Sequence, residues 1–460
     1  MLAVGSVLMS LALLMFLAYR GYSVLILAPA LATFAVFMSG EEALLANYTQ
    51  IFMVKLGDFA TIYFPLFLLS AVFGKIMESS GYALSIADYI STKIGAERSV
   101  LAVVLSCSVL TYGGVSLFVV VFAVYPVAVE LLRKSDTPKR LIPAAVAVGS
   151  FTYTMTSIPG SPAIPNVIPS QYFGTNTFAA PGIGIIATII TFVLSMFWLN
   201  YQVRLACAKG EGYGNYVDNI ISVPKKKLPD FWLAIAPVFI VILLNYACVK
   251  YVFPNMDTLY LKNEKYGATD IQTVAGNWAI IVALFFAIAF IIATNYKKID
   301  ITRCINTGAS ESLAPIFNTA SVVGYGAVIN SLPGFIIIRD WILSLASGNP
   351  IVSSAVVTSV LAGVTGSASG GMSIALETLG TKYLEMATAV GINPEVIHRI
   401  VAIASGSLDI LPHNGAIVSL LAICGLTHRE SYKDIFIGAM MAATVAAVIV
   451  TVIGVFFGAF

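Results

Sequence analysis

Long apolar stretches separated by short charged segments dominate this chain. A helix that spans a membrane needs about 20 apolar residues, and eight largely uncharged stretches come close to that length. They are residues 2–19, 24–38, 58–79, 180–199, 230–249, 276–294, 308–331 and 434–458. Two shorter segments, 82–93 and 335–345, read as amphipathic helices. The pattern predicts an all-α polytopic membrane protein. Its first apolar stretch is expected to be a transmembrane helix of the mature protein and not a cleaved secretory signal.

Two other uncharged stretches are too long for one helix and too short for two full crossings. The first, 99–129, has 31 residues, and the second, 341–376, has 36. Each has a middle rich in glycine and serine, at 111–116 and 366–373. We therefore expect re-entrant helical hairpins over residues 99–132 and 350–386, each returning to the side from which it entered.

Two further apolar segments contain proline and glycine in their interior. Segment 138–173 is interrupted at 157–165, and segment 394–427 is interrupted at 411–416. Proline removes a backbone donor and breaks a helix. Lipid cannot satisfy the amides of a broken backbone, so such a segment must be buried in protein or line a watery cavity. The sequence thus predicts two broken helices.

The basic residues predict an orientation. If the N-terminus lies outside and both hairpins return to their side of entry, 18 of the 25 Lys and Arg residues lie inside, the sign expected of membrane proteins. Arg399 is among those placed outside, and no Lys or Arg is expected inside the hairpins or the breaks. We expect a multi-pass protein of the inner (plasma) membrane, with both termini outside the cytoplasm.

The order of predicted elements occurs twice. Each half has three helices, an amphipathic helix, a re-entrant hairpin, a broken helix and a final helix. Gly113-Gly114-x-Ser116 matches Gly370-Gly371-x-Ser373 at an offset of 257, and Pro159 matches Pro412 at an offset of 253. With the orientation predicted from the basic residues, the first half, 1–199, enters the membrane from outside and the second half, 230–460, enters from inside. Residues 200–229 then form a cytoplasmic linker. Inverted repeats with discontinuous helices are typical of secondary transporters, whose substrate binds near the midplane.

Composition narrows the class further. The 460 residues are 58% hydrophobic and 10% charged, against roughly 25% charged in soluble domains. This excludes an ordinary cytosolic enzyme, a nucleic-acid binder and a disordered scaffold. The five cysteines are scattered without metal-binding spacing, and we read them as small apolar residues. We expect no metal and no cofactor.

The glycine-rich turns are the first candidates for substrate binding. Glycines let backbone amides approach an anion, and hydroxyl groups beside them add donors. The candidates are Tyr112, Gly113, Gly114, Ser116, Ser369, Gly370, Gly371 and Ser373. The alternative is that these glycines and serines close tight turns and pack helices.

The breaks supply the second set of candidates. Ser161 and Asn166 lie in or near the first break, and His413 and Asn414 lie in the second. We expect these four to contact substrate or to satisfy the freed backbone groups. Hydroxyl residues beside the breaks often bond back to carbonyls of their own helix. Such residues here are Thr154, Thr156 and Ser407.

Asp409 is the one carboxylate between Arg399 and Arg429. It precedes His413 by four residues, so both lie on one face if the helical turn persists. Ionisable groups at membrane depth are expensive and usually functional, and an imidazole beside a carboxylate suits a proton relay. Asp409 and His413 are therefore candidates for ion coupling, and a structural ion pair or cap at Asp409 is the alternative. His398 and His428 read as surface histidines.

Other functional classes fit less well. Ser161 and His413 have the chemistry of a hydrolase dyad, but no G-x-S-x-G elbow surrounds Ser161, and their equivalent places in the repeats explain them without catalysis. An intramembrane aspartyl protease needs two aspartates in the membrane, and only Asp409 qualifies. A passive anion channel is the remaining alternative, which saturable, gradient-dependent flux would distinguish. We expect no enzymatic activity.

Three motifs resemble the gluconate permease (GntP) family of the ion transporter superfamily. They are residues 111–120 (TYGGVSLFVV), 158–162 (IPGSP) and 408–416 (LDILPHNGA). The resemblance covers nearly the whole chain and is strongest to the branch of hydroxybutyrate permeases. It implies a homodimer with a scaffold domain, 1–56 and 230–300, and a transport domain, mainly 57–199 and 301–460, that moves as an elevator.

Two departures from gluconate-type members affect the expected substrate. Those members carry a Glu in the first hairpin and a His/Pro-rich first break, whereas this chain has Tyr112-Gly113-Gly114 and 158–162 there. A smaller, less hydroxylated carboxylate than gluconate is expected. The sequence thus predicts a secondary active transporter, a proton symporter for a short-chain hydroxy acid, with sodium coupling on the same fold as the alternative.

Overall fold

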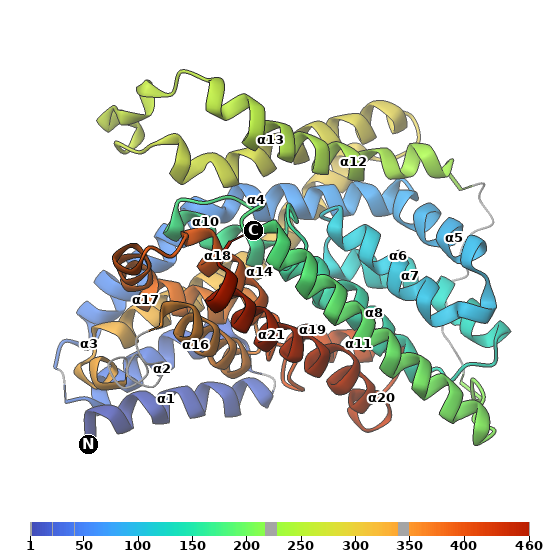
Figure 1. The fold of residues 1–460 in the computed structure, drawn as a ribbon, viewed down its shortest axis with the longest axis horizontal. Helices are drawn as coiled ribbons and strands as arrows, with labels where there is room; N and C mark the ends of the chain where they lie inside the picture. Colours follow the sequence, from blue (N-terminus) through green and yellow to red (C-terminus); the bar gives the residue numbers. More distant parts are fainter. Residues whose placement is uncertain (1, 21, 41, 217–227, 339–348, 460) are drawn as a thin grey trace.

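The computed structural model describes all residues except 1, 21, 41, 217–227, 339–348 and 460, and within the described residues every regular element is a helix (Figure 1). In the described part of the chain, six helices are long and apolar enough to cross a membrane, or up to seven if one bent pair counts as a span. The predicted all-helical membrane fold is confirmed at this level.

The long helices form the frame of the molecule. They are α1 (Leu2–Tyr19), α2 (Val24–Met38), α4 (Met53–Ser79), α11 (Pro181–Ala208), α12 (Phe231–Ala247), α13 (Ile271–Asn295), α14 (Ile301–Ser331) and α21 (Ala442–Phe457). A short helix α3 (Leu44–Ala46) and a π-helical stretch (Asn47–Phe52) extend α4 toward the N-terminus, and α20 (His428–Ile435) with a π-helical stretch (Phe436–Met441) does the same for α21.

Several of these helices run past the predicted spans. The stretch predicted at 58–79 begins at Leu44, and the stretch predicted to end at 199 continues to Ala208. The prediction relied on uncharged runs, but charged side chains near helix ends form ion pairs and stay within the helix. In α4, the Nζ of Lys55 lies 2.9 Å from the carboxylate of Glu377.

Aspartates begin three helices of the second half. Asp230 accepts hydrogen bonds from the second and third N–H groups of α12, Asp270 caps α13, and Asp300 caps α14 by accepting from Arg303 N at 2.9 Å. An N-cap carboxylate satisfies donors that the helix leaves free and favours its positive end. These caps fix where each of the three helices starts.

Both predicted hairpins are present as pairs of helices joined by a tight turn. The first pairs α6 (Ser99–Tyr112) with α7 (Leu117–Lys134), and the second pairs α16 (Pro350–Thr365) with α17 (Ala368–Val390). Ahead of the first hairpin, the amphipathic helix α5 (Tyr82–Ile94) is bent by 103° from α6. Its predicted counterpart, 335–345, is helical over 335–338 and otherwise lies outside the described residues.

Both predicted broken helices are confirmed. The first consists of α8 (Leu141–Phe151), the single turn α9 (Tyr153–Thr156) and α10 (Ile164–Phe173), with residues 157–163 non-helical. The second consists of α18 (Pro394–Ser405) and α19 (Gly415–Cys424), with residues 406–414 non-helical. We refer to 157–163 as the first break and to 406–414 as the second break.

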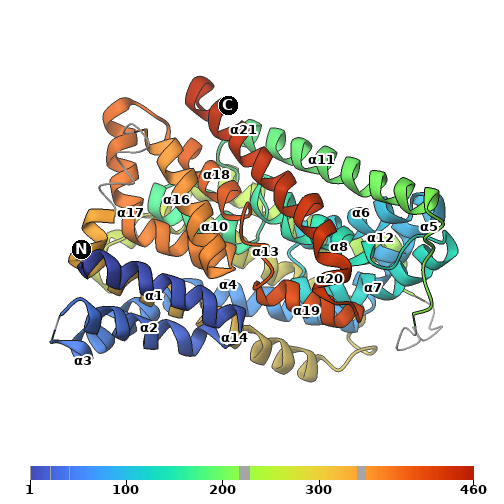
Figure 2. The ribbon, with the colours of Figure 1, turned by 90° about the horizontal axis from the view of Figure 1, so that it is seen from below.

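The helices assemble around the pair α4 and α14, which pack so closely that a Cβ on Gly308 would lie 2.7 Å from the Cα of Val72. Helices α12 and α13 lie along one edge and α1 and α2 along the opposite edge (Figure 1). Helices α11 and α21 pack together on the side away from α2 and α14 (Figure 2). The hairpins and broken helices fill the space between these edges.

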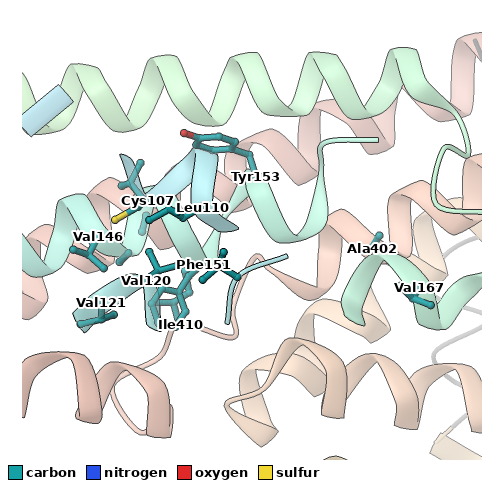
Figure 3. Packing of buried hydrophobic residues seen from close by; sticks show 14 of the residues in the cluster. Cys107, Leu110, Val120, Val121, Val146, Phe151, Tyr153, Val167, Ala402 and Ile410 are labelled. Atoms are coloured by element: carbon teal, nitrogen blue, oxygen red, sulfur yellow. The ribbon is translucent and has the colours of Figure 1, made fainter. Parts of the chain in front are cut away.

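The main apolar core joins the two halves of the chain. Figure 3 shows Ile410, from the second break, beside Val120 of the first hairpin and Phe151 of α8. Gly149 lets α8 approach α6, because a Cβ there would lie 2.5 Å from the carbonyl oxygen of Val104. The packing therefore places the second break against elements that precede it by more than 250 residues.

Candidate functional site

The turn of the first hairpin lies on the first break. Tyr112, at the end of α6, donates a hydrogen bond from its hydroxyl to the carbonyl oxygen of Pro159 at 2.9 Å. Gly114 adopts a φ of +87°, which favours glycine, and a Cβ there would lie 3.1 Å from Pro162. Two of the predicted turn residues thus hold the turn against the break.

The other two predicted residues of this turn contact the frame. A Cβ on Gly113 would lie 2.6 Å from the side chain of Val238 in α12. Ser116 is the N-cap of α7, and its hydroxyl lies 3.1 Å from the position of a Cβ on Gly74 in α4. Among the described residues, the Ser116 side chain makes no capping hydrogen bond.

The turn of the second hairpin lies on the second break in the same way. Gly366 adopts a φ of +61°, and a Cβ there would lie 2.9 Å from Cδ2 and 3.0 Å from Nε2 of His413. The second break also reaches the end of α9 just before the first break, because a Cβ on Gly406 would lie 2.8 Å from the side chain of Thr156. Both turns and both breaks therefore form one region, which we call the junction.

The second turn lies at the start of the predicted glycine- and serine-rich middle, 366–373, and not at Gly370-Gly371-x-Ser373 as the repeat suggested. It consists of Gly366 and Ser367, whereas Gly370, Gly371 and Ser373 lie inside α17. Ser367 caps α17 by accepting from Gly370 N at 3.1 Å, and this cap starts the helix before the glycine pair. The structural counterpart of Gly113 is thus Gly366, at an offset of 253 that equals the offset of Pro159 and Pro412.

The glycine pair of α17 serves packing in this structure. A Cβ on Gly371 would lie 2.1 Å from the backbone nitrogen of Ala362, so the two helices of the hairpin touch backbone to backbone. The hydroxyl of Ser369 lies 3.4 Å from that of Ser367. Ser373 is buried, and within the described residues its hydroxyl has no hydrogen-bond partner.

Every backbone N–H group of the first break is hydrogen-bonded within the protein. Its five N–H groups belong to Ser157, Ile158, Gly160, Ser161 and Ala163, and each donates to an acceptor of the protein. The hydroxyl of Ser161 donates to Thr154 O at 2.8 Å. Asn166 donates from Nδ2 to Ser161 O at 2.8 Å and to Thr177 O at 3.0 Å. In this conformation, Ser161 and Asn166 hold the broken backbone together.

Arg399 lies beside the first break, with Nη1 3.5 Å from Ser157 O, contrary to the expectation that no Lys or Arg lies there. Its side chain is fully buried, and Nε donates to Ala179 O at 2.8 Å while Nη2 donates to Thr177 O at 2.8 Å. Nη1 donates to Asn166 Oδ1 at 2.6 Å. The sequence had placed Arg399 outside because it follows a short polar segment, but α18 is buried from Val396 onward.

The neighbouring His398 is also fully buried rather than at the surface. Its Nδ1 lies 2.6 Å from the hydroxyl of Thr175. One turn earlier on α18, the carboxylate of Glu395 accepts from Ala180 N at 3.1 Å. Three residues of α18 therefore hold the loop between α10 and α11.

The second break differs from the first in its polar groups. Asn414 caps α19 by accepting from Ala416 N at 2.7 Å and from Ile417 N at 3.2 Å, and it donates to Asp409 O at 2.8 Å. Asp409 is buried, and within the described part of the chain neither its Oδ1 nor Nε2 of His413 has a hydrogen-bond partner. Buried polar groups normally have a hydrogen-bond partner. The exceptions Asp409 Oδ1 and His413 Nε2 are therefore candidates for contact with a substrate or a coupling ion.

Asp409 and His413 do not share a helical face, because residues 406–414 are non-helical. Within the described residues they form no ion pair with each other. The hydroxyl residues beside the breaks do bond to nearby carbonyls, as predicted. Thr154 donates to Gly149 O, Thr156 to Thr152 O, and Ser407 to Ala404 O.

The junction also contains three residues that the sequence did not propose as site residues: Thr177, Asn245 and Arg399. Thr177 O accepts from Gly160 N, Asn166 Nδ2 and Arg399 Nη2. Asn245 of α12 donates to Gly160 O at 3.1 Å and to Thr177 Oγ1 at 3.3 Å. Two features of the sequence could have identified them: Asn245 is an amide in an otherwise apolar span, and Arg399 is a cation in an otherwise apolar broken helix.

No group of three or more His, Cys, Asp or Glu residues in the described part is placed to hold a metal ion.

The whole chain matches one family of transport proteins. Residues 1–456 match the GntP family permease. This chain belongs to the GntP permease family. It is therefore a multi-pass membrane transporter and not an enzyme.

Relatives of this permease carry the same general description. It is 42% identical over 459 residues to a Bacillus subtilis (strain 168) protein described as "Uncharacterized transporter YxjC", with 96% of this chain and 97% of the relative covered. A Haemophilus influenzae protein described as "Uncharacterized transporter" is 29% identical over 178 residues, which cover 38% of this chain and 40% of the relative.

A solved structure supports the fold. The crystal structure of the Alcanivorax borkumensis YdaH transporter, described as having an unusual topology, matches with a TM-score of 0.55 at 15% identity. The match covers 90% of both chains. The permease thus has a YdaH-like transporter fold.

Proposed function

We propose that this permease is a secondary active transporter that takes up a small organic carboxylate together with a proton. The observation that carries the proposal is the junction of two helical turns and two broken helices, where, among the described residues, Asp409 Oδ1 and His413 Nε2 have no hydrogen-bond partner. Discontinuous helices that meet inside a membrane protein are where secondary transporters bind substrate and coupling ion.

A short-chain hydroxy acid such as 3-hydroxybutyrate is the proposed substrate. The resemblance to hydroxybutyrate permeases supports this choice, and so does the lack of a charged group in the first turn. The junction has few polar atoms available to a ligand. Among the described residues, Ser373 and His413 each have a side-chain atom without a hydrogen-bond partner, whereas Ser161, Asn166 and Asn414 are hydrogen-bonded to the backbone. Such a site suits a ligand with one carboxylate and one hydroxyl better than a polyol.

Elevator movement of one part against the other is the proposed mechanism. Helices α1, α2, α12 and α13 would form the scaffold domain and the dimer contacts, and the hairpins and broken helices would form the transport domain. The close helix packing within the second hairpin supports a transport domain that moves as a rigid unit. The homodimer, the inverted orientation of the two halves and the outside location of the termini belong to the same proposal.

Asp409 is the proposed proton carrier. Ionisable groups buried at membrane depth mark proton pathways, and within the described residues no ion pair occupies this carboxylate. His413 is the second coupling candidate, since its ring contacts the second turn and would respond to movement of that hairpin.

The decisive experiment measures uptake of labelled 3-hydroxybutyrate into proteoliposomes without sodium. An inward proton gradient should stimulate saturable uptake over a no-gradient control. Asp409→Asn keeps the shape but removes the titrating group, so it should abolish gradient-driven uptake while counterflow exchange of substrate continues.

Three outcomes would contradict parts of this proposal. Unchanged driven uptake by Asp409→Asn would exclude Asp409 as the carrier. Stimulation by sodium but not by protons would favour the sodium-coupled alternative. Flux that does not saturate or respond to any ion gradient would indicate a passive channel.

A further inference from the structure

The guanidinium of Arg399 is surrounded by oxygen atoms from three places: Ser157 in the first break, Asn166 in α10, and Thr177 and Ala179 in the loop between α10 and α11. Three backbone carbonyls, those of Ser157, Thr177 and Ala179, and one amide oxygen, that of Asn166, accept from it. The donor–acceptor distances run from 2.6 to 3.5 Å. All four acceptors lie more than 200 positions before Arg399 in sequence.

This positive charge has no directly paired carboxylate. Within the described residues Arg399 forms no ion pair, although its side chain is fully buried. Glu395, one turn earlier on α18, directs a carboxylate oxygen to Ala180 N instead. Taking a charge out of water is costly unless it is paired and hydrogen-bonded, so the oxygen atoms around Arg399 are its main compensation.

Such a set of oxygen atoms is also the chemistry that holds a coupling ion. Hard cations bind backbone carbonyls and amide oxygens, and transporters use the carbonyls of unwound helices to coordinate sodium. We propose that Arg399 is a tethered cation that takes the place of a coupling ion at the first break. Resting on the proposed function, this assigns ion exchange to the second break alone and makes Arg399 a positioning residue that determines ion specificity.

The second break supports this division by contrast. At the position equivalent to Ser161, Asn414 donates its amide to Asp409 O, and no Lys or Arg side chain is hydrogen-bonded to the described residues of that break. A covalently attached cation therefore lies beside the first break, whereas the second contains a buried carboxyl group that forms no ion pair with the described residues.

Thermal unfolding of the purified permease in detergent tests the proposal without substrate or transport. Arg399→Ala removes the cation and leaves the oxygen atoms, Arg399→Lys keeps a charge, and Arg399→Gln keeps donors without charge. Melting temperatures are measured in choline chloride and in increasing sodium chloride at constant ionic strength. Arg303→Ala, at the exposed start of α14, is the matched control for loss of an arginine.

We expect wild type, Arg303→Ala and Arg399→Lys to melt at similar temperatures that do not depend on sodium. Arg399→Ala should melt several degrees lower in choline, and sodium should restore part of the loss in a saturable manner, because binding to the folded state stabilises it by mass action. Guanidinium at millimolar concentration should do the same. Arg399→Gln should resemble Arg399→Ala.

Two results would overturn the proposal. If Arg399→Gln melts as high as Arg399→Lys, hydrogen bonding without charge suffices; this comparison stands even if Arg399→Ala fails to fold. If sodium raises the melting temperature of wild type as much as that of Arg399→Ala, the arginine does not occupy an ion position. Failure of 3-hydroxybutyrate uptake would contradict the proposed function but would leave these melting results unaffected.

Discussion

Gly371→Ala separates the two interpretations of the glycine pair in the second hairpin. If Gly371 lines a substrate site, one added methyl group should weaken substrate binding and leave the fold intact. In the structure the new Cβ would instead lie 2.1 Å from Ala362 N, 2.3 Å from Ala362 Cα and 2.5 Å from Leu361 C. All three neighbours are backbone atoms of α16, which cannot move aside like a flexible side chain.

The expected cost follows from these distances. Ordinary contact begins at 3.4 Å, so α16 and α17 would have to separate by about 1.3 Å, the difference from 2.1 Å. Overpacking of this kind costs about 3 kcal/mol at its upper end, and the better helix propensity of alanine offsets roughly 1 kcal/mol. We expect a net destabilisation of about 2 kcal/mol, visible as a lower melting temperature of the purified permease.

Gly57→Ala is the matched control, because Gly57 also lies inside a long helix and a Cβ there has nothing within 4 Å. It should leave the melting temperature unchanged or slightly raised. Gly370→Ala should fall between the two, since its nearest contact is the flexible Ser367 side chain at 3.1 Å. The packing interpretation is refuted if Gly371→Ala melts like Gly57→Ala while the KM for the transported carboxylate rises.

Two further predictions concern the second break and the basic end of α8. Asn414→Ala removes the cap of α19 and should cost about 1 kcal/mol of stability, whereas Asn414→Asp should recover most of it; a raised KM with unchanged melting would indicate substrate contact instead. Arg140 holds Glu211 through two hydrogen bonds of 2.7 and 3.1 Å and lowers the pKa of that carboxyl. A lowered folded-state pKa gives stability at neutral pH that is lost as pH falls through it, so the difference in melting temperature between wild type and Glu211→Gln should shrink on acidification.

The apolar pattern of the chain was enough to predict the helices, the hairpins and the breaks. Segment 394–427 illustrates why: its composition is apolar enough for a helix, and Pro412 predicts an interruption. The non-helical stretch is 406–414, so it begins five residues earlier than the predicted 411–416 and ends before Gly415, which starts α19. These are local constraints, so they can be recognised without knowing what packs nearby. Helix ends were less certain, because Lys55 and other charged residues stay within helices when a partner such as Glu377 lies close.

The position of the second turn could not be derived from the repeat alone. Gly370-Gly371-x-Ser373 is the better sequence match to the first turn, yet Ser367 starts α17 three residues before Gly370 by capping it. Glycine serves a turn when φ is positive and a helix contact when a second backbone is near. A glycine in a turn and a glycine at a helix contact look alike in the sequence. Only the packing of α16 against Gly371 shows that the pair serves a helix contact.

Arg399 was placed outside for a related reason. Its acceptors, among them Ser157 O and Ala179 O, come from a segment 220 to 242 positions earlier. Counting basic residues between spans treats each as part of a solvated loop. The contacts that bury Arg399 come from residues distant in sequence. Its neighbours in the sequence therefore do not predict its burial, apart from the apolar helix in which it lies.

The asymmetry between the two breaks is the feature that most constrains mechanism. A repeated architecture would allow both breaks to bind an exchangeable ion. In the first break, however, every N–H group is paired, and a fixed guanidinium donates to Ser157 O and to the neighbouring Thr177 O. In the second, Asn414 supports the backbone by donating to Asp409 O, and no cation among the described residues pairs with the carboxyl of Asp409. A permanent charge cannot be released on either side of a membrane, so on the proposed mechanism the driving ion must be carried by the second break, through Asp409 with His413 as the second candidate.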